Sequence, residues 1–263
     1  MRMALGLLAL WVLMAAAMCA GWLWQWRHRN AGVVDVLWTA GLGAGALLLA
    51  ALGSGARAPR LLLAFLGSAW SARLASHLWL RVRREGEDGR YRHLRSRWGD
   101  SPGRWLAFFQ LQALLVPLFA LPFAAVAANP RSSPPWLAAG CALWALSLAG
   151  ETVADAQLAR FRADPANRGR TFRDGLWRYS RHPNYFFEWL HWLTYVILAA
   201  GSPLWALAWL GPLLMGLFLR FLSGVPWAEA QALRSRGEDY RDYQRRTPMF
   251  LPWFPRRVSP DRS

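Results

Sequence analysis

The 263-residue sequence has no lysine, so all 31 of its basic residues are arginine. It has only two cysteines, Cys19 and Cys141, which excludes a disulfide framework and a zinc site built on cysteine. Charged residues make up 17% of the chain, below the roughly 25% typical of soluble domains. Hydrophobic residues make up 55% and are gathered into long runs. These features exclude a disordered chain and argue against an ordinary soluble globule.

Several catalytic and nucleotide-binding motifs are also missing. The sequence contains no P-loop, no G-x-S-x-G and no HExxH, and its five histidines are too scattered for a metal-ligand pattern. The glycines in Gly41-x-Gly43-x-Gly45 lie inside an apolar run with no strand before them. We therefore interpret them as a site of close helix packing. A bound nucleotide would need an arginine-rich pocket built on helix ends and loops, and we expect no metal.

Seven apolar segments are candidates for membrane-spanning helices, each of which needs about 20 apolar residues. We interpret the first as a mature span, because its run is too long for a typical signal peptide. The sequence predicts an all-α integral membrane fold of about seven transmembrane helices, as one domain over residues 1–263. The oligomeric state stays open. The predicted spans are Met3–Trp24, Val33–Gly53, Leu61–Leu80, Trp105–Ala128, Trp136–Leu158, Tyr185–Ala200 and Pro203–Leu219.

The net charge of +16 is compatible with nucleic-acid binding or with a membrane protein. The positions of the arginines decide between these two. The stretches before, between and after the seven segments would lie alternately on the two sides of a membrane, and 26 arginines fall on one side and four on the other. This asymmetry predicts an N-terminus outside and a C-terminus in the cytoplasm. We expect membrane lipids as partners and no nucleic acid. The all-arginine composition indicates a GC-rich bacterial genome, and hence the bacterial inner membrane.

Ionisable residues inside spanning helices are costly and need an explanation. Glu151, Asp155 and Arg162 are spaced so that they share one helical face. They could form an ion-pair network at the helix end, or the wall of a cavity that opens to the cytoplasm and binds a polar ligand. Arg73 and His77 share a face of the third segment, and Asp35 lies at a matching depth. Here the alternatives are a structural Asp35–Arg73 pair and an anion or substrate site.

The densest polar cluster runs from Gly175 to Glu188, immediately before and into the sixth segment. Its arginines can hold phosphates through bidentate hydrogen bonds, and its tyrosines offer stacking faces. Asn184 can present an amide to a carboxamide or to a base edge. His182 could act in acid–base chemistry, although a lone histidine before proline is more often structural. A helix-contact role is expected for His191.

These residues resemble the C-terminal half of steroid 5-alpha-reductases. They resemble more closely a bacterial membrane family of unknown function related to those enzymes (domain of unknown function 1295). Further shared motifs are Asp35-Val-Leu-Trp38, Gly86-Glu-Asp with Tyr91 and Trp98-Gly99, and the tail from Tyr240 to Trp253. The resemblance implies a seven-helix fold with a cytoplasm-facing NADPH pocket in residues 134–255. The resemblance implies cofactor-binding roles for Asp155, Arg162, Asn184, Glu188 and Trp192, with Arg170 and Arg181 as looser matches. From their residue type and position, Glu151, Tyr179 and His182 are expected to join them.

Two departures from the reductase pattern concern the active site. Trp70 stands where the reductases have a catalytic tyrosine, and an indole can donate a hydrogen bond but cannot pass on a proton. Phe187 replaces a glycine before the motif glutamate, which predicts less space beside Asn184 and Glu188.

Three functions follow from the retained and changed parts of the pattern. The first is an NADPH-dependent reductase of a C=C bond in a lipophilic, steroid- or isoprenoid-like substrate, with Asp35, Arg73 and His77 at the substrate end. The second is an S-adenosylmethionine-dependent methyltransferase of a lipophilic acceptor, since isoprenylcysteine carboxyl methyltransferases carry a similar RHPNY motif. The third is a non-enzymatic lipid-binding membrane protein.

Overall fold

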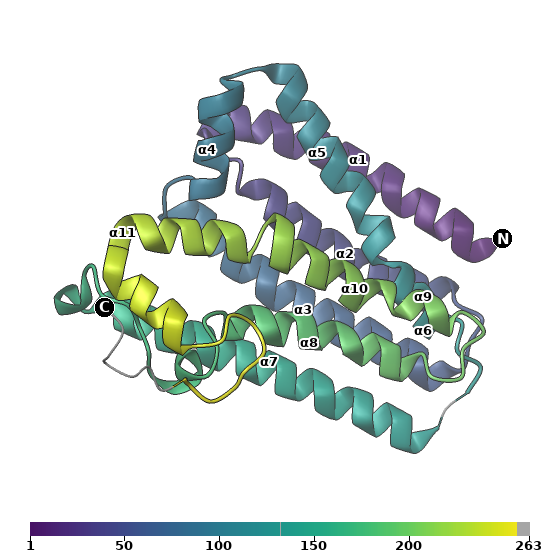
Figure 1. Ribbon diagram of the computed structural model, residues 1–263. Helices are drawn as coiled ribbons and strands as arrows, with labels where there is room; N and C mark the ends of the chain where they lie inside the picture. Colours follow the sequence, from purple (N-terminus) through teal and green to yellow (C-terminus); the bar gives the residue numbers. More distant parts are fainter. Residues whose placement is uncertain (132, 257–263) are drawn as a thin grey trace. The chain divides into compact units, whose positions relative to one another are not determined.

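The computed structural model describes residues 1–131 and 133–256, which form helices and turns without a β-strand (Figure 1). Their contacts divide them into two compact units. Among the described residues, the first unit comprises Met1–Cys141 with Thr194–Gly211, and the second comprises Ala142–Leu193 with residues 212–256. The helices are α1 (Arg2–His28), α2 (Val33–Leu52), α3 (Arg57–Arg84), α4 (Gly89–Trp98), α5 (Pro102–Phe119), α6 (Leu121–Ala127), α7 (Pro134–Ala163), α8 (Pro183–Leu198), α9 (Trp205–Ala208), α10 (Leu210–Leu217) and α11 (Val225–Arg246), with short turns η1 (Pro165–Asn167), η2 (Gly175–Arg178) and η3 (Phe218–Leu222).

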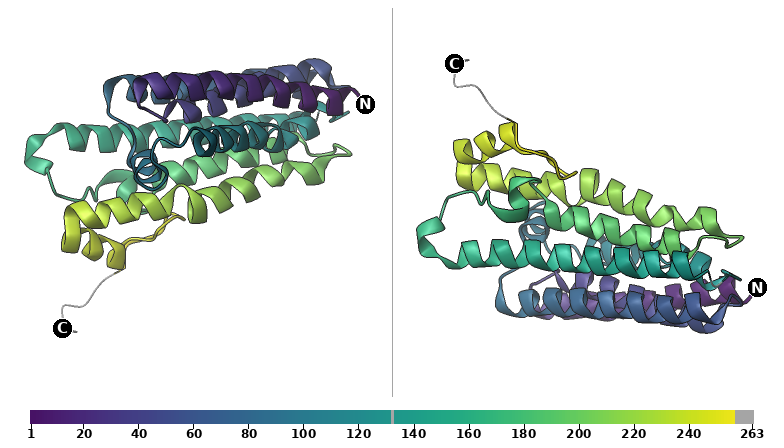
Figure 2. Two further views of the ribbon diagram at one scale, coloured as in Figure 1. Left: turned by 90° about the horizontal axis from the view of Figure 1, so that it is seen from above. Right: turned by 90° about the horizontal axis from the view of Figure 1, so that it is seen from below.

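Long helices packed side by side form the first unit, where α2 lies against α3 and α1 lies against both α2 and α5 (Figures 1 and 2). The glycines of α2 permit this close packing. A Cβ atom added at Gly43 would come within 2.4 Å of the Ser71 hydroxyl on α3, and one at Gly41 within 2.5 Å of the Met14 sulfur on α1. The interpretation of the glycine run as a helix-packing site is confirmed.

All seven predicted spans fall on helices, but within residues 1–131 and 133–256 only five stretches are long and apolar enough to cross a membrane. These are Arg2–His28, Val33–Leu52, Pro102–Ala127, Pro134–Ala163 and Trp205–Arg246. Two helices at predicted spans are not long and apolar enough. The helix α3 carries arginine at both ends and in its middle, and α8 has only 16 residues. The five apolar helices indicate an integral membrane protein.

Several helices are interrupted, and each interruption has a local cause. Pro117 lacks a backbone N–H, and α5 ends soon after it. Ala120 separates α5 from α6. Gly237 has φ 51° and ψ −123° and kinks α11. That conformation is accessible to glycine and costly for other residues. The predicted tail helix after Pro226 is therefore present, although it bends.

In the second unit, the segment between α7 and α8 is tied to α7 by side-chain hydrogen bonds. The Trp177 indole N–H donates to the Ala154 carbonyl at 2.9 Å, and the Leu176 amide donates to the Gln157 side chain at 3.0 Å. Gly175 has a φ of 59°, and Gln157 would block a Cβ atom there. The predicted loop over 160–184 begins after Ala163, where α7 ends, and it is held in place by these bonds.

Candidate functional site

The first turn of α8 and the C-terminal third of α7 are joined by a contact between two of the predicted cofactor residues. The Asn184 side-chain amide donates to Asp155 Oδ1 at 3.0 Å. The Asn184 side-chain oxygen accepts a hydrogen bond from the Tyr185 amide at 3.0 Å, which fixes the orientation of the side chain. Pro183 begins α8, where a missing N–H costs nothing. The motif thus places an oriented amide beside a carboxylate of α7.

Two more predicted residues lie one turn apart on α8. The Trp192 indole N–H donates to Glu188 Oε1 at 3.3 Å. Glu188 is buried, as is Glu151, which lies one turn before Asp155 on α7. A buried carboxylate within an apolar helix is costly, and such residues commonly mark functional sites in membrane proteins. The structure therefore places four acidic and amide side chains of the predicted site on the two helices that the sequence indicated.

Phe187 occupies space between the same two helices. Its ring lies against Gly150 of α7, where an added Cβ atom would come within 2.3 Å of the ring. The absence of a side chain at position 150 therefore accommodates the large residue at position 187. The sequence analysis drew attention to Phe187 but missed the compensating glycine.

Arg181 and His182 contact Glu229, which lies in the first turns of α11. The Arg181 Nε atom lies 2.7 Å from Glu229 Oε1, and the His182 Nε2 atom lies 3.3 Å from the same oxygen. Arg181 Nη1 also donates to the backbone carbonyls of Gln244, at 3.0 Å, and Thr247, at 2.8 Å. The Arg181 guanidinium thus joins the start of α8 to both ends of α11.

His182 is enclosed on a second side by the ring of Tyr185, stacked at 5.4 Å. Burial lowers the pKa of His182, and this effect exceeds the opposing influence of the Glu229 carboxylate. The imidazole is therefore held neutral in the folded protein. These contacts agree with the structural role that the sequence favoured for this histidine.

The remaining predicted cofactor residues, Arg162, Arg170 and Tyr179, are exposed to solvent. Arg162 lies in the last turn of α7. Burial, together with the like charge of Arg162, lowers the pKa of Arg236 on α11. The Arg236 Nε atom is buried and has no hydrogen-bond partner among the described residues. Sequence reasoning missed Arg236, because one arginine among nine after the last span carries no distinguishing signal. The two arginines together offer positive charge to an anion.

In the first unit, Asp35 at the start of α2 is bound by two neighbouring residues of α4. Arg90 Nη2 lies 3.0 Å from Asp35 Oδ2, and the Tyr91 hydroxyl donates to Asp35 Oδ1 at 2.7 Å. The carboxylate is thus bound by α4, and the expected alternative of a structural Asp35–Arg73 pair stays a prediction. A depth argument from the sequence could not find the contacts with α4, since it considered only residues inside the predicted spans.

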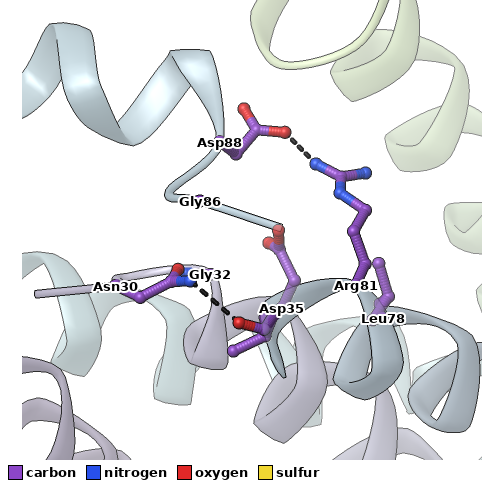
Figure 3. Close-up of a pocket in the computed structure, with 8 residues that line it drawn as sticks. Asn30, Gly32, Asp35, Leu78, Arg81, Gly86 and Asp88 are labelled. Atoms are coloured by element: carbon purple, nitrogen blue, oxygen red, sulfur yellow. Dashed lines mark hydrogen bonds and ion pairs between the residues drawn. The ribbon is translucent and has the colours of Figure 1, made fainter. Parts of the chain in front are cut away.

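A small cavity adjoins Asp35, and Figure 3 shows the Asp35 side chain pointing toward the segment that carries Gly86. The volume of the cavity is about 10 Å³, which is room for about one water molecule. Arg81 and Asp88, which line it, form an ion pair with each other. The cavity therefore does not by itself accommodate a lipophilic substrate.

The three residues predicted for the substrate end lie on two helices, Asp35 on α2 and the other two on α3. Arg73 is half-buried in α3, and His77 is exposed one turn later. Trp70 is fully buried in the same helix. Tyr91 is buried, and burial together with the charge of Asp35 raises its pKa. Sequence reasoning placed Tyr91 in a motif but gave it no role.

The comparisons with known proteins agree with the resemblance seen in the motifs. The chain matches the family described as "Protein of unknown function (DUF1295)" over residues 21–247. It is 30% identical, over 257 aligned residues, to an uncharacterized protein of the fission yeast Schizosaccharomyces pombe. That alignment covers 85% of this chain and 73% of the yeast protein. Because the family match extends over most of the sequence and includes both polar clusters, the chain belongs to the DUF1295 family.

Proposed function

We propose that this protein is a membrane-embedded reductase that uses NADPH to reduce a C=C bond in a lipophilic, steroid- or isoprenoid-like substrate. One observation carries the proposal: buried Glu188 and the Asp155–Asn184 contact occur at the positions where the resemblance to steroid 5-alpha-reductases implies cofactor-binding residues. The asymmetric distribution of arginine supports an orientation in which this site faces the cytoplasm of a bacterial cell.

The donor set fits a dinucleotide. Asn184 is an oriented amide that can pair with a carboxamide, while Glu188 and Asp155 can accept hydrogen bonds from hydroxyl or amide groups. Arg162 and Arg170 are exposed, and Arg236 has a buried Nε atom with no acceptor among the described residues. Such arginines are suited to phosphate groups. NADPH would supply the hydride, and the protein would bind and orient it.

At the substrate end, the proposal assigns Asp35, Arg73 and His77. Asp35 is bound to Arg90 and Tyr91, so its carboxylate is held in one orientation. The buried Trp70 can donate a hydrogen bond but cannot pass on a proton. The proton that completes the reduction would therefore come from another residue at this end or from water.

The experiment that tests the proposal is a thermal-shift measurement on the full-length protein in detergent, with NADPH and S-adenosylmethionine as separate ligands. We expect NADPH to raise the melting temperature, since a ligand that binds the folded state stabilises it. Arg162→Ala should abolish the shift, while Arg168→Ala, an exposed arginine of the adjoining loop, should leave it unchanged.

The methyltransferase is the second candidate function, because the Arg181-His182-Pro183-Asn184-Tyr185 run also resembles isoprenylcysteine carboxyl methyltransferases. A shift with S-adenosylmethionine alone would favour it, and it would depend less on the arginines. The absence of a shift with either ligand would favour a non-enzymatic lipid-binding protein.

A further inference from the structure

The segment that follows α11 runs back along the start of α8. The Trp253 amide donates to the Tyr179 carbonyl at 2.9 Å. The Phe250 ring lies 6.2 Å from the ring of Phe186 and 6.1 Å from that of Trp189, both on α8. The segment therefore packs against the first half of α8, where aromatic side chains predominate.

Three large apolar side chains of this segment are unusually exposed. Leu251 is 62% exposed, Trp253 71% and Phe254 70%, although the Trp253 amide is hydrogen-bonded to the Tyr179 carbonyl. Aromatic side chains at the boundary between apolar helices and water are typical of membrane-interface contacts. In water, the exposure of three such side chains would not stabilise the folded protein, so their exposure indicates a contact with another apolar phase.

A cavity lined by arginine lies in the same segment. Its volume is about 130 Å³, and Arg181, Arg245 and Arg256 are among the residues that line it. Glu229 neutralises Arg181, whereas Arg256 has no acidic partner among the described residues. Arg245 has only loose contacts with acidic groups, at 3.4 Å and 3.8 Å. The cavity therefore carries uncompensated positive charge.

We propose that residues 245–256 bind the phosphate headgroup of an anionic phospholipid, with Arg245 and Arg256 holding the phosphate and Trp253 and Phe254 entering the lipid. The cavity is smaller than the roughly 300 Å³ or more of pockets that enclose whole small-molecule ligands, so it suits a single phosphate group. The exposed apolar side chains beside it select a phosphate that is attached to acyl chains over one free in solution. The contacts and charges that support lipid binding do not depend on the proposed reductase function, although Arg181, one of the predicted cofactor residues, also lines the cavity.

Native mass spectrometry of the full-length protein in detergent tests this assignment. We expect phosphatidylglycerol to be retained in preference to phosphatidylcholine. The double variant Arg245→Gln/Arg256→Gln should lose this preference by about tenfold or more, because each arginine near an anionic surface contributes substantially to binding. Trp253→Ser/Phe254→Ser should weaken the retention of both lipids.

A matched control removes the same charge elsewhere in the second unit. Arg168 and Arg234 are exposed and do not line the cavity, so Arg168→Gln/Arg234→Gln should retain phosphatidylglycerol as the unmodified protein does. Size-exclusion chromatography and the melting temperature check that every variant is folded.

Four results would overturn the assignment. They are equal retention of the two lipids by the unmodified protein, full retention of phosphatidylglycerol by the cavity variant, displacement of the lipid by millimolar glycerol phosphate, and its displacement by NADPH. The third would indicate a soluble phosphate ester, and the fourth would make the cavity part of the cofactor site. The thermal shift with NADPH is measured separately, so failure of the lipid proposal and failure of the reductase proposal are distinguishable.

Discussion

Two carboxylates organise the two polar clusters of this protein in different ways. Asp35 of the first unit accepts from two groups, Arg90 and Tyr91. Glu229 of the second unit accepts from four, on the residues Arg181, His182, Tyr240 and Gln244. The Glu229 side chain is 16% exposed, compared with 30% for Asp35. Glu229 is therefore the single centre of its cluster.

The Asp35 cluster shares its charges among several acids. Arg90 also binds Asp88, and Asp88 binds Arg81. Nearby, Arg95 is bound by Glu87 at 2.7 Å and by Asp100 at 3.3 Å. When one acid is removed from such a network, the arginines keep other partners. The comparison teaches that the consequence of losing a carboxylate depends on how many buried donors it leaves without an acceptor.

The comparison predicts its largest effect for Glu229→Ala. Removing this side chain leaves Arg181 without an acidic partner in a mostly buried position, and we expect a loss of about 3 kcal/mol in the free energy of unfolding. The melting temperature of the purified variant in detergent measures the loss. Glu238→Ala is the control on the same helix, because Glu238 is 71% exposed and pairs only with exposed arginines. Equal losses in the two variants would contradict the role of Glu229.

A smaller effect is expected for Asp35→Ala, about 1–2 kcal/mol, because Arg90 retains Asp88 while the buried Tyr91 hydroxyl loses its acceptor. Tyr91→Phe in the same background should then cost little more. This double-mutant comparison is made with the same melting assay. If Asp35→Ala lowers the melting temperature as much as Glu229→Ala does, then Asp88 does not replace Asp35 as the partner of Arg90.

The helices and the polar residues of α7 and α8 could be predicted from the sequence, because apolar runs and motif spacing are local properties. The partners of Asp35, Arg181 and His182 could not. Each is a contact between residues at least 47 positions apart, and the partners Arg90, Tyr91 and Glu229 belong to α4 and α11. The apolar run Tyr185–Ala200 also predicts a span, but α8 has 16 residues, fewer than the roughly 20 that a membrane crossing needs.

The last difference between the clusters is their response to acid. The partners of Asp35 are an arginine and a tyrosine, and neither titrates between pH 5 and 8. The Glu229 cluster contains His182, and burial holds the pKa of this imidazole below its usual value of about 6.5. The unfolded chain therefore takes up a proton at a higher pH than the folded protein does. Stability contributed by the neutral imidazole is then present above about pH 6.5 and is lost as the pH falls toward the lower folded value.

We therefore expect the melting temperature of the unmodified protein to fall as the pH is lowered from 7.5 to 5. The slope attributable to His182 cannot exceed about 1.4 kcal/mol per pH unit, which corresponds to one proton. His182→Gln removes the titrating group and should flatten this part of the curve, even if the variant is less stable throughout. His28→Gln is the matched control, because His28 is exposed and its loss should leave the slope unchanged. An unchanged slope in His182→Gln would mean that the acid response arises elsewhere, and the contrast between the two carboxylate clusters would then be one of packing alone.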